Sequence, residues 1–220
     1  MQKYSKNYKE RYCEEYEKDH INGLILAAGL SSRMGGFKPL LPFGRKTLIE
    51  ASIDSMLDAG VQQVVVVLGF RGREIETVLN RRYGAEITFA WNERYAETDM
   101  LESVKCGLRA MPDCQSFFLL PGDMPVVQRH TFLKLAASRP EEEPFLLFPT
   151  LEGRPKHPPL IHADFIPVIL EYRGEGGLRQ LWKQHTETIL HVPVEDPGVW
   201  VDVDTRAQYE HCIACFQPGL

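Results

Sequence analysis

Residues 24–38 read LILAAGLSSRMGGFK, an apolar run that leads into a loop of small residues and ends in a lysine. The run from Leu24 to Ala28 stops at Gly29, and this pattern predicts a buried strand that opens into a loop. Small residues let backbone N–H groups approach a phosphate closely, and Ser31 and Ser32 add hydroxyl donors. The stretch therefore predicts a phosphate-binding loop at the end of a strand.

Arg33 and Lys38 bring two cations to the same loop. Transfer of a phosphoryl or nucleotidyl group depends on positioning phosphates and offsetting their charge, and such a loop supplies both. We therefore predict that Lys38 lies on the α-phosphate of a bound nucleotide. The loop lacks the Gly-Lys-Ser/Thr ending of a Walker A motif and the G-x-G-x-x-G spacing of a dinucleotide fingerprint. The alternative is a structural glycine loop with two solvated cations.

Outward from this loop, apolar runs alternate with helical patterns. The β-branched run Val64–Leu68 is typical of a strand covered on both faces. Further strands are predicted at 86–91 and 116–120, and helices at 47–59, 74–82, 100–111 and 131–137. This alternation predicts a Rossmann-like three-layer α/β/α fold with a mostly parallel central sheet. Ligands bind at the carboxyl ends of the strands in such sheets.

Beyond Pro140 the alternation loosens. The patterns predict a strand at 145–148, a surface loop at 153–159, a turn at 174–177 before a helix at 178–184, and a strand at 189–194 that leads to 199–205. The loop at 153–159 is predicted from its glycine, prolines and basic residues. A final helix follows residue 205.

Two acidic segments are candidates for a metal site. Asp123 lies at the tip of a predicted strand, between Gly122 and Met124-Pro125, and Mg²⁺ prefers carboxylates, phosphates and water as ligands. A cap on the following helix explains Asp123 equally well. Asp202 and Asp204 alternate along a predicted strand, so both side chains point the same way. One or both complete the metal site, unless they are solvent-exposed or Asp204 caps the last helix.

Composition excludes several classes of function. A net charge of −5 over 220 residues argues against nucleic acid as the main partner, because a phosphate backbone requires a basic face. No apolar run is long enough to cross a bilayer, and residues 1–20 lack the apolar core of a secretory signal. The five cysteines are odd in number and scattered, which fits a reducing compartment, so we expect the cytoplasm. They are Cys13, Cys106, Cys114, Cys212 and Cys215.

A family resemblance follows from these motifs. Residues 26–38 match the pattern Leu-Ala-Ala-Gly-x-Ser-x-Arg-Met-Gly-x-x-Lys position for position. On this basis the chain resembles the MobA-like NTP transferases, and within them the molybdenum cofactor cytidylyltransferase branch, which has a nucleotide-diphospho-sugar transferase-like fold. The resemblance runs from about Ile21 to Ile213. Later landmarks are Asn92, Met100, Ser103, Gly107-Leu108, Gly122–Pro125, Gly153–Pro158 and Asp202–Thr205.

The resemblance implies roles for individual residues. It makes Lys38, Asp123 and Arg33 catalytic, and it assigns Mg²⁺ to Asp123 with help from Asp202 or Asp204. The nucleotide-binding residues would be Leu26, Ala27, Ala28, Gly29, Ser31, Ser32, Arg33, Lys38, Asn92 and Ser103. Asn92 and Ser103 would contact ribose or base, and the loop around His157 would face the acceptor.

The chain departs from the family pattern in three places. Pro155 or Lys156 stands where the family has the second glycine of its Gly-His-Pro loop, Asp99 stands where many members have glycine, and Arg206-Ala207-Gln208 replaces Pro-Glu-Asp. These positions fall on base and acceptor surfaces. They therefore affect which NTP and which acceptor are used, and they leave the phosphate and metal chemistry intact.

The expected reaction moves an NMP onto the phosphate of molybdenum cofactor and releases pyrophosphate, with Mg²⁺ as cofactor. CTP is favoured over GTP because the loop reads Ala27-Ala28. One alternative keeps the chemistry and uses a sugar or polyol phosphate as acceptor. Another, from a different class, is a non-catalytic molybdenum cofactor carrier or insertion chaperone, against which Arg33, Lys38 and Asp123 together argue. A molybdoenzyme would be the protein partner, and neither nucleic acid nor a membrane is expected.

The expected organisation is a polar N-terminal extension over residues 1–20 and one nucleotidyltransferase domain over residues 21–215. The acceptor-facing part of that domain would be about 141–200. Cys212 and Cys215 form a Cys-x-x-Cys beside His211, but a structural zinc site needs a further pair of ligands. We therefore expect ordinary helix residues at these positions.

Overall fold

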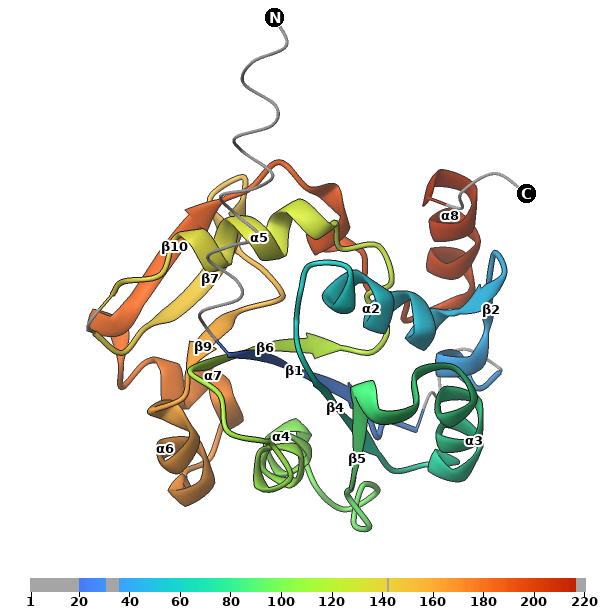
Figure 1. The fold of residues 1–220 in the computed structure, drawn as a ribbon, viewed down its shortest axis with the longest axis horizontal. Coiled ribbons are helices and arrows are strands. Elements are labelled where there is room, and N and C mark those ends of the chain that lie inside the picture. The colour runs from blue at the N-terminus through green and yellow to red at the C-terminus, as the bar shows by residue number, and fades with distance from the viewer. Residues whose placement is uncertain (1–19, 31–35, 142, 217–220) are drawn as a thin grey trace, which may run out of the picture.

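The computed structural model describes residues 20–30, 36–141 and 143–216 (Figure 1). Its centre is an eight-stranded sheet. The strands in spatial order are β10 (Ile189–Pro193), β7 (Leu146–Leu151), β9 (Leu160–His162), β6 (Ser116–Pro121), β1 (Ile21–Ala27), β4 (Val64–Leu68) and β5 (Ile87–Trp91), and β8 (Arg154–Pro155) pairs with β7. Strands β6, β1, β4 and β5 run parallel to one another, and β9 is antiparallel to both of its neighbours. The predicted mostly parallel sheet is confirmed.

Helices cover both faces of the sheet (Figure 1). On one face lie α2 (Leu48–Leu57), α3 (Gly72–Tyr83) and α5 (Arg129–Ala137), and on the other lie α4 (Met100–Arg109), α6 (Phe165–Glu171) and α7 (Gly177–Trp182). In β4, Val66 packs toward the first face and Val65 toward the second, because successive side chains of a strand alternate. A strand buried on both faces must be apolar throughout, which is why Val64–Leu68 was predictable.

Smaller elements complete the chain. They are the β2–β3 hairpin (Pro42–Phe43 and Lys46–Thr47), the 3₁₀ helices η1 (Lys38–Leu40), η2 (Gly84–Glu86), η3 (Thr186–Thr188) and η4 (Pro197–Trp200), and the C-terminal helix α8 (Arg206–Phe216). Helix α8 packs on the hairpin and α2 through Cys212 and Tyr209. None of the helices in the described ranges is long and apolar enough to span a membrane.

Helix starts follow local chemistry. Thr47 caps α2 and forms a capping box with Glu50, whose carboxylate accepts from Thr47 N at 2.6 Å. Asp99 caps α4 by accepting a hydrogen bond from Glu102 N at 3.2 Å. Both caps satisfy backbone donors at a helix start and place the helices where the periodicity predicted them.

Two predictions for the C-terminal half need correction. Residues 153–159 are a surface loop only in part: residues 153–155 are exposed, but Arg154 and Pro155 form β8, and Pro158 and Pro159 are buried. Residues 199–205 are not a strand, because they form the end of η4 and then an extended segment outside any sheet. In the first case proline and glycine content predicted exposure of the whole stretch, whereas its end packs against β6, where Leu119 N donates to Pro159 O.

Candidate active site

The site begins where β1 and β6 end side by side. These strands are parallel neighbours, and Leu26 pairs with Pro121. Gly122 N donates to Leu26 O at 2.9 Å. A Cβ atom at Gly122 would lie 3.0 Å from that same oxygen. A larger residue at this position would therefore push the ends of β1 and β6 apart. The glycine therefore allows the close approach that brings Asp123 to the loop after β1.

Lys38, the first residue of η1, joins three distant parts of the chain. Its Nζ donates to Asp123 Oδ2 at 2.6 Å and to Asp204 Oδ1 at 2.9 Å. Burial acts to lower the pKa of Lys38, but its ion pairs and hydrogen bonds with Asp123 and Asp204 outweigh this, so the pKa lies above its ordinary value. Lys38 is therefore a fixed positive charge at neutral pH.

The carboxylate of Asp123 is only half satisfied by the described residues. A small cavity of about 110 Å³ opens at this point, lined by Leu26, Ala27, Gly29, Lys38, Pro39, Gly122 and Asp123. Asp123 Oδ1 is buried and accepts no hydrogen bond from any residue that the structure describes. A buried polar atom without a partner costs free energy, so a ligand that engages this oxygen is favoured.

A divalent cation fits this donor set. Within the described ranges, no three His, Cys, Asp or Glu residues gather closely enough to hold a metal without other ligands. Mg²⁺ needs fewer protein ligands, since it is commonly held by one or two carboxylates together with substrate phosphates and water. Asp123, with its unpartnered Oδ1, and Asp204 provide such a pair. Lys38 Nζ bridges these two carboxylates.

The extended segment after η4 is docked directly on Asp123. Val203 N donates to Asp123 O at 3.0 Å, and the Val203 side chain is buried against Phe43 and Tyr209. This contact brings Asp204 to Lys38. Asp202, in contrast, is exposed, and its charge acts on His157.

A residue that the sequence analysis missed holds these segments together. Asp196 is fully buried, and its carboxylate accepts from Gln128 N at 2.8 Å, Thr131 Oγ1 at 2.7 Å and Gly198 N at 2.8 Å. It therefore ties the chain after Asp123 to the chain before Asp204. An aspartate before Pro-Gly reads as an ordinary turn residue, so the sequence carries no signal of this burial.

Asn92 and Ser103 come together, as their predicted shared role requires. Asn92 Nδ2 donates to Ser103 Oγ and to Thr98 Oγ1, both at 3.0 Å, and Asn92 Oδ1 accepts from Arg94 N at 3.1 Å. Both side chains are buried. In this structure they therefore fix the loop between β5 and α4, and their contact with ribose or base stays a prediction.

The remaining loop residues divide into two groups. Ala27 and Ala28 are buried and Gly29 is exposed at the end of β1. Ser31, Ser32 and Arg33 lie outside the described residues, so their predicted phosphate contacts are not tested by the structure.

His157 lies at the edge of a second cavity of about 570 Å³. This cavity is lined by the apolar residues Met100, Leu119, Phe148, Trp182 and Ile189 and by the basic residues Arg179, Lys183 and His191, among others. Burial lowers the pKa of His157, although a hydrogen bond with the Leu119 backbone and the charge of Asp123 oppose it. A neutral imidazole within electrostatic reach of Asp123 connects this cavity to the carboxylates.

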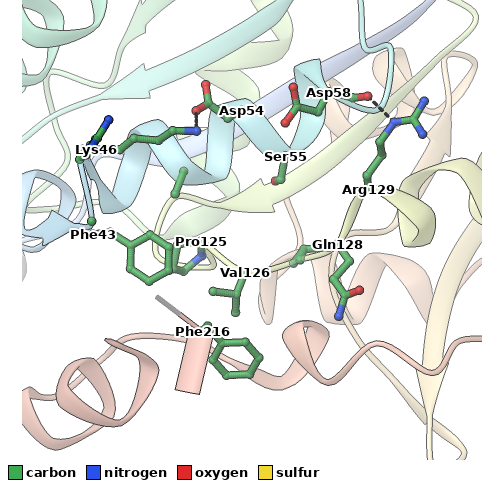
Figure 2. Close-up of a pocket in the computed structure, with 14 residues that line it drawn as sticks. Phe43, Lys46, Asp54, Ser55, Asp58, Pro125, Val126, Gln128, Arg129 and Phe216 are labelled. Atoms are coloured by element: carbon green, nitrogen blue, oxygen red, sulfur yellow. Dashed lines mark hydrogen bonds and ion pairs between the residues drawn. The ribbon is translucent and has the colours of Figure 1, made fainter. Parts of the chain in front are cut away.

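A larger cavity lies elsewhere. It measures about 890 Å³ and lies between α2, the segment 125–129 and Phe216 of α8 (Figure 2). Two of its basic side chains are already engaged: Lys46 forms an ion pair with Asp54, and Arg129 Nε donates to Asp58 O at 2.6 Å. None of the predicted site residues lines it.

Comparison with known proteins shows what the chain is similar to. A model of the MobA-like NTP transferase domain matches residues 23–189. The chain is 32% identical over 189 residues to the molybdenum cofactor cytidylyltransferase of Escherichia coli K12, a match that covers 84% of this chain and 91% of that protein. It is also 28% identical over 196 residues to the nicotine blue oxidoreductase of Paenarthrobacter nicotinovorans, covering 86% and 94%.

A solved structure shows the same fold. A nucleotidyl transferase from Methanothermobacter superposes with a TM-score of 0.75 at 24% identity, covering 89% of this chain and 96% of that one.

Proposed function

The chain belongs to the MobA-like NTP transferase family, and from this premise we propose that it transfers CMP from CTP to the phosphate of molybdenum cofactor. Family and fold make it a nucleotidyltransferase. The proposal for donor and acceptor is supported by the cytidylyltransferase relative. The observation that carries the chemistry is the contact of Lys38 with both Asp123 and Asp204, beside the small cavity that Lys38 and Asp123 line.

In the proposed reaction, an oxygen of the acceptor phosphate attacks the α-phosphorus of CTP in line. The bond from the α-phosphorus to the oxygen bridging to the β-phosphate breaks, and pyrophosphate leaves. Lys38 offsets the negative charge that grows on the α-phosphate, because its ammonium group stays protonated between two carboxylates. The acceptor phosphate is already ionised near neutral pH, so the site needs no general base.

The carboxylates have a second task. Divalent metal ions are typical of this family. We propose that Asp123 and Asp204 hold Mg²⁺, with Asp202 as the alternative second ligand. The ion would neutralise phosphate oxygens and orient the triphosphate. Asp123 Oδ1, which is buried and has no hydrogen-bond partner among the described residues, is available to bind the ion. The hydrogen bond from Val203 N to Asp123 O keeps the two acidic segments together.

The other assignments stay part of the proposal. Backbone groups at Leu26, Ala27, Ala28 and Gly29, with Ser31, Ser32 and Arg33, would bind the triphosphate, and Asn92 and Ser103 would contact ribose or base. His157 and the region of about 141–200 would face the acceptor. The proposal places the reaction in the cytoplasm, with a molybdoenzyme as the protein that receives the product.

Pyrophosphate release tests this function. Purified protein with Mg²⁺ is assayed with CTP, GTP or ATP, each paired with molybdenum cofactor, a sugar phosphate or a polyol phosphate. We expect release with CTP and molybdenum cofactor at the highest kcat/KM. If kcat/KM is highest with a sugar or polyol phosphate, that compound is the acceptor, and the proposed transfer chemistry still holds. No pyrophosphate with any pair would reject transfer and favour a carrier.

A second candidate function follows from the nicotine blue oxidoreductase, which matches slightly more of the chain than the cytidylyltransferase does, at lower identity. An oxidoreductase would pass electrons from a donor to an acceptor and release no pyrophosphate; one that takes them from a nicotinamide cofactor would oxidise NADH or NADPH when an electron acceptor is supplied. Oxidation of NADH or NADPH by the same preparation is therefore measured in parallel. Lys38 between two carboxylates favours nucleotidyl transfer, because this arrangement offsets phosphate charge.

A further inference from the structure

Two cationic side chains, those of Arg154 and Lys156, lie over the indole ring of Trp200. Trp200 ends η4 and is 38% exposed. Lys156 Nζ lies 3.1 Å from the centre of the indole ring, and Arg154 Cζ lies 6.0 Å from it. A cation at such a distance is attracted by the negative face of an aromatic ring. We call Arg154, Lys156 and Trp200 the Trp200 cluster.

The backbone holds both cations in position. Arg154 lies in β8, where it pairs with Leu151 of β7. The next turn is fixed as well, because Lys156 N donates to Pro149 O at 2.8 Å. The two side chains therefore start from a backbone fastened to the central sheet. Groups that are ordered before binding lose less freedom when a ligand arrives.

The cluster lies next to the proposed site. Lys156 precedes His157, and the charges of Lys156, Asp123 and Asp202 all act on the His157 ring. Trp200 lies two residues before Asp202 on the segment that docks on Asp123. The cluster therefore borders the proposed catalytic carboxylates on the side of His157.

Neither cation is neutralised by a neighbouring acid. In the part of the chain that the structure describes, no carboxylate forms an ion pair with Arg154 or Lys156. A guanidinium offers a planar fork of donors to a phosphate or carboxylate, and an ammonium adds a compact charge. The cluster has the composition of an anion site whose anion comes from outside the described chain.

We propose that the Trp200 cluster binds an anionic group of the acceptor, a phosphate or a carboxylate, and so selects anionic acceptors over neutral ones. This inference rests on the proposed nucleotidyl transfer. An NTP could supply the same chemistry through its γ-phosphate, so the experiment must separate the acceptor from the nucleotide.

Steady-state kinetics distinguish binding of the acceptor from binding of the nucleotide. Pyrophosphate release is measured for the unchanged protein and for Lys156→Met, with acceptor and CTP varied in turn. The acceptor KM is expected to rise about tenfold, the effect of losing one charged contact, while kcat and the KM for CTP change less than twofold. An unchanged acceptor KM overturns the inference. A rise confined to the KM for CTP overturns it too, because the cluster would then bind the nucleotide.

Lys134→Met is the matched control, since Lys134 is an exposed lysine on α5 outside the site. It should leave all three constants unchanged. A rise in acceptor KM as large as that of Lys156→Met would show an effect of net charge alone and would reject the cluster.

A binding measurement separates this inference from the proposed function. Inorganic phosphate is titrated into protein saturated with CTP and Mg²⁺, and the indole N–H resonance of Trp200, assigned with Trp200→Phe, is followed by NMR. We expect a saturable shift that weakens several-fold in Lys156→Met and persists in Lys134→Met. If this NMR shift is observed but no acceptor gives pyrophosphate release, the anion site is supported and the proposed function is rejected. Equal shifts in Lys156→Met and the unchanged protein reject the anion site.

Discussion

Two cavities lie along one short segment of this molecule and differ greatly in size. Asp123 lines the cavity of about 110 Å³, and residues 125–129, immediately downstream, line the cavity of about 890 Å³ (Figure 2). The small cavity is lined by Lys38 and Asp123, and Lys38 also contacts Asp204. One oxygen of Asp123 has no partner in the described chain. The large cavity contains charges that already hold elements together.

The contrast shows that volume does not identify the functional site here. Lys46 and Arg82 both pair with Asp54, and the Tyr83 hydroxyl donates to Asp54 at 2.7 Å, so this network joins β3, α2 and α3. Lys38 instead joins η1 to the two segments that carry Asp123 and Asp204. We infer that the small cavity performs chemistry and that the charges of the large one stabilise the fold.

Lys38→Met is the most damaging change that this comparison predicts. Loss of the ammonium should lower kcat for pyrophosphate release by about 1,000-fold, because removal of one donor from a preorganised anion site costs 10²–10³. Circular dichroism should stay unchanged, and CTP binding should weaken less than turnover. A variant that keeps more than a tenth of the activity would place the chemistry elsewhere.

Asp196→Ala tests the hydrogen bonds that link the segment after Asp123 to the segment before Asp204. The change leaves two backbone donors and the Thr131 hydroxyl without their buried acceptor. We expect a loss of about 3 kcal/mol in the free energy of unfolding, measured with urea. Turnover at 25 °C should also fall, since the segments of Asp123 and Asp204 lose their link. Unchanged stability together with unchanged turnover would show that this link is dispensable.

The pH dependence of stability follows from His157. Its pKa is lowered in the folded state, so its neutral form is favoured there and the unfolded chain binds the proton more readily. The resulting stability is present above the unfolded pKa of 6.5 and is lost as pH falls through the folded pKa. Urea unfolding at pH 7.5 and pH 5 should therefore show a smaller decrease for His157→Gln than for the unchanged protein. His191→Gln, an exposed position beside the same cavity, should behave like the unchanged protein.

Lys46→Met should have the smallest effect on turnover. Lys46 is 39% exposed and its ion pair with Asp54 lies at the large cavity. Exposed pairs of this kind contribute about 1 kcal/mol or less, and Arg82 still pairs with Asp54. Pyrophosphate release should stay within twofold. A loss approaching that of Lys38→Met would remove the distinction between the cavities.

The sequence predicted the parallel half of the sheet well and the rest less well. Val64–Leu68 is a strand with the predicted bounds, since a continuous β-branched run has few alternatives. Strand β9 was missed, because three residues inserted antiparallel between β6 and β7 leave no periodic signal. Long apolar runs reveal elements whose neighbours are local, whereas short strands depend on distant partners.

For the site, the sequence predicted that Lys38 and Asp123 meet and missed what positions them. The meeting of Lys38 and Asp123 was expected from residue type and from strand ends that share an edge. Asp204 and Asp202 could not be separated, because they differ only in how the segment docks through Val203. Asp196 could not be found, since its burial results from tertiary packing.

A double-mutant cycle of Lys38→Met and Asp123→Asn on kcat for pyrophosphate release tests the central claim most directly. Residues that act on one triphosphate as a unit give strongly non-additive effects. We predict that the double variant is hardly slower than Lys38→Met alone. A double variant whose loss equals the product of the two single losses would show that the two residues act independently, and that the site described here is not one catalytic unit.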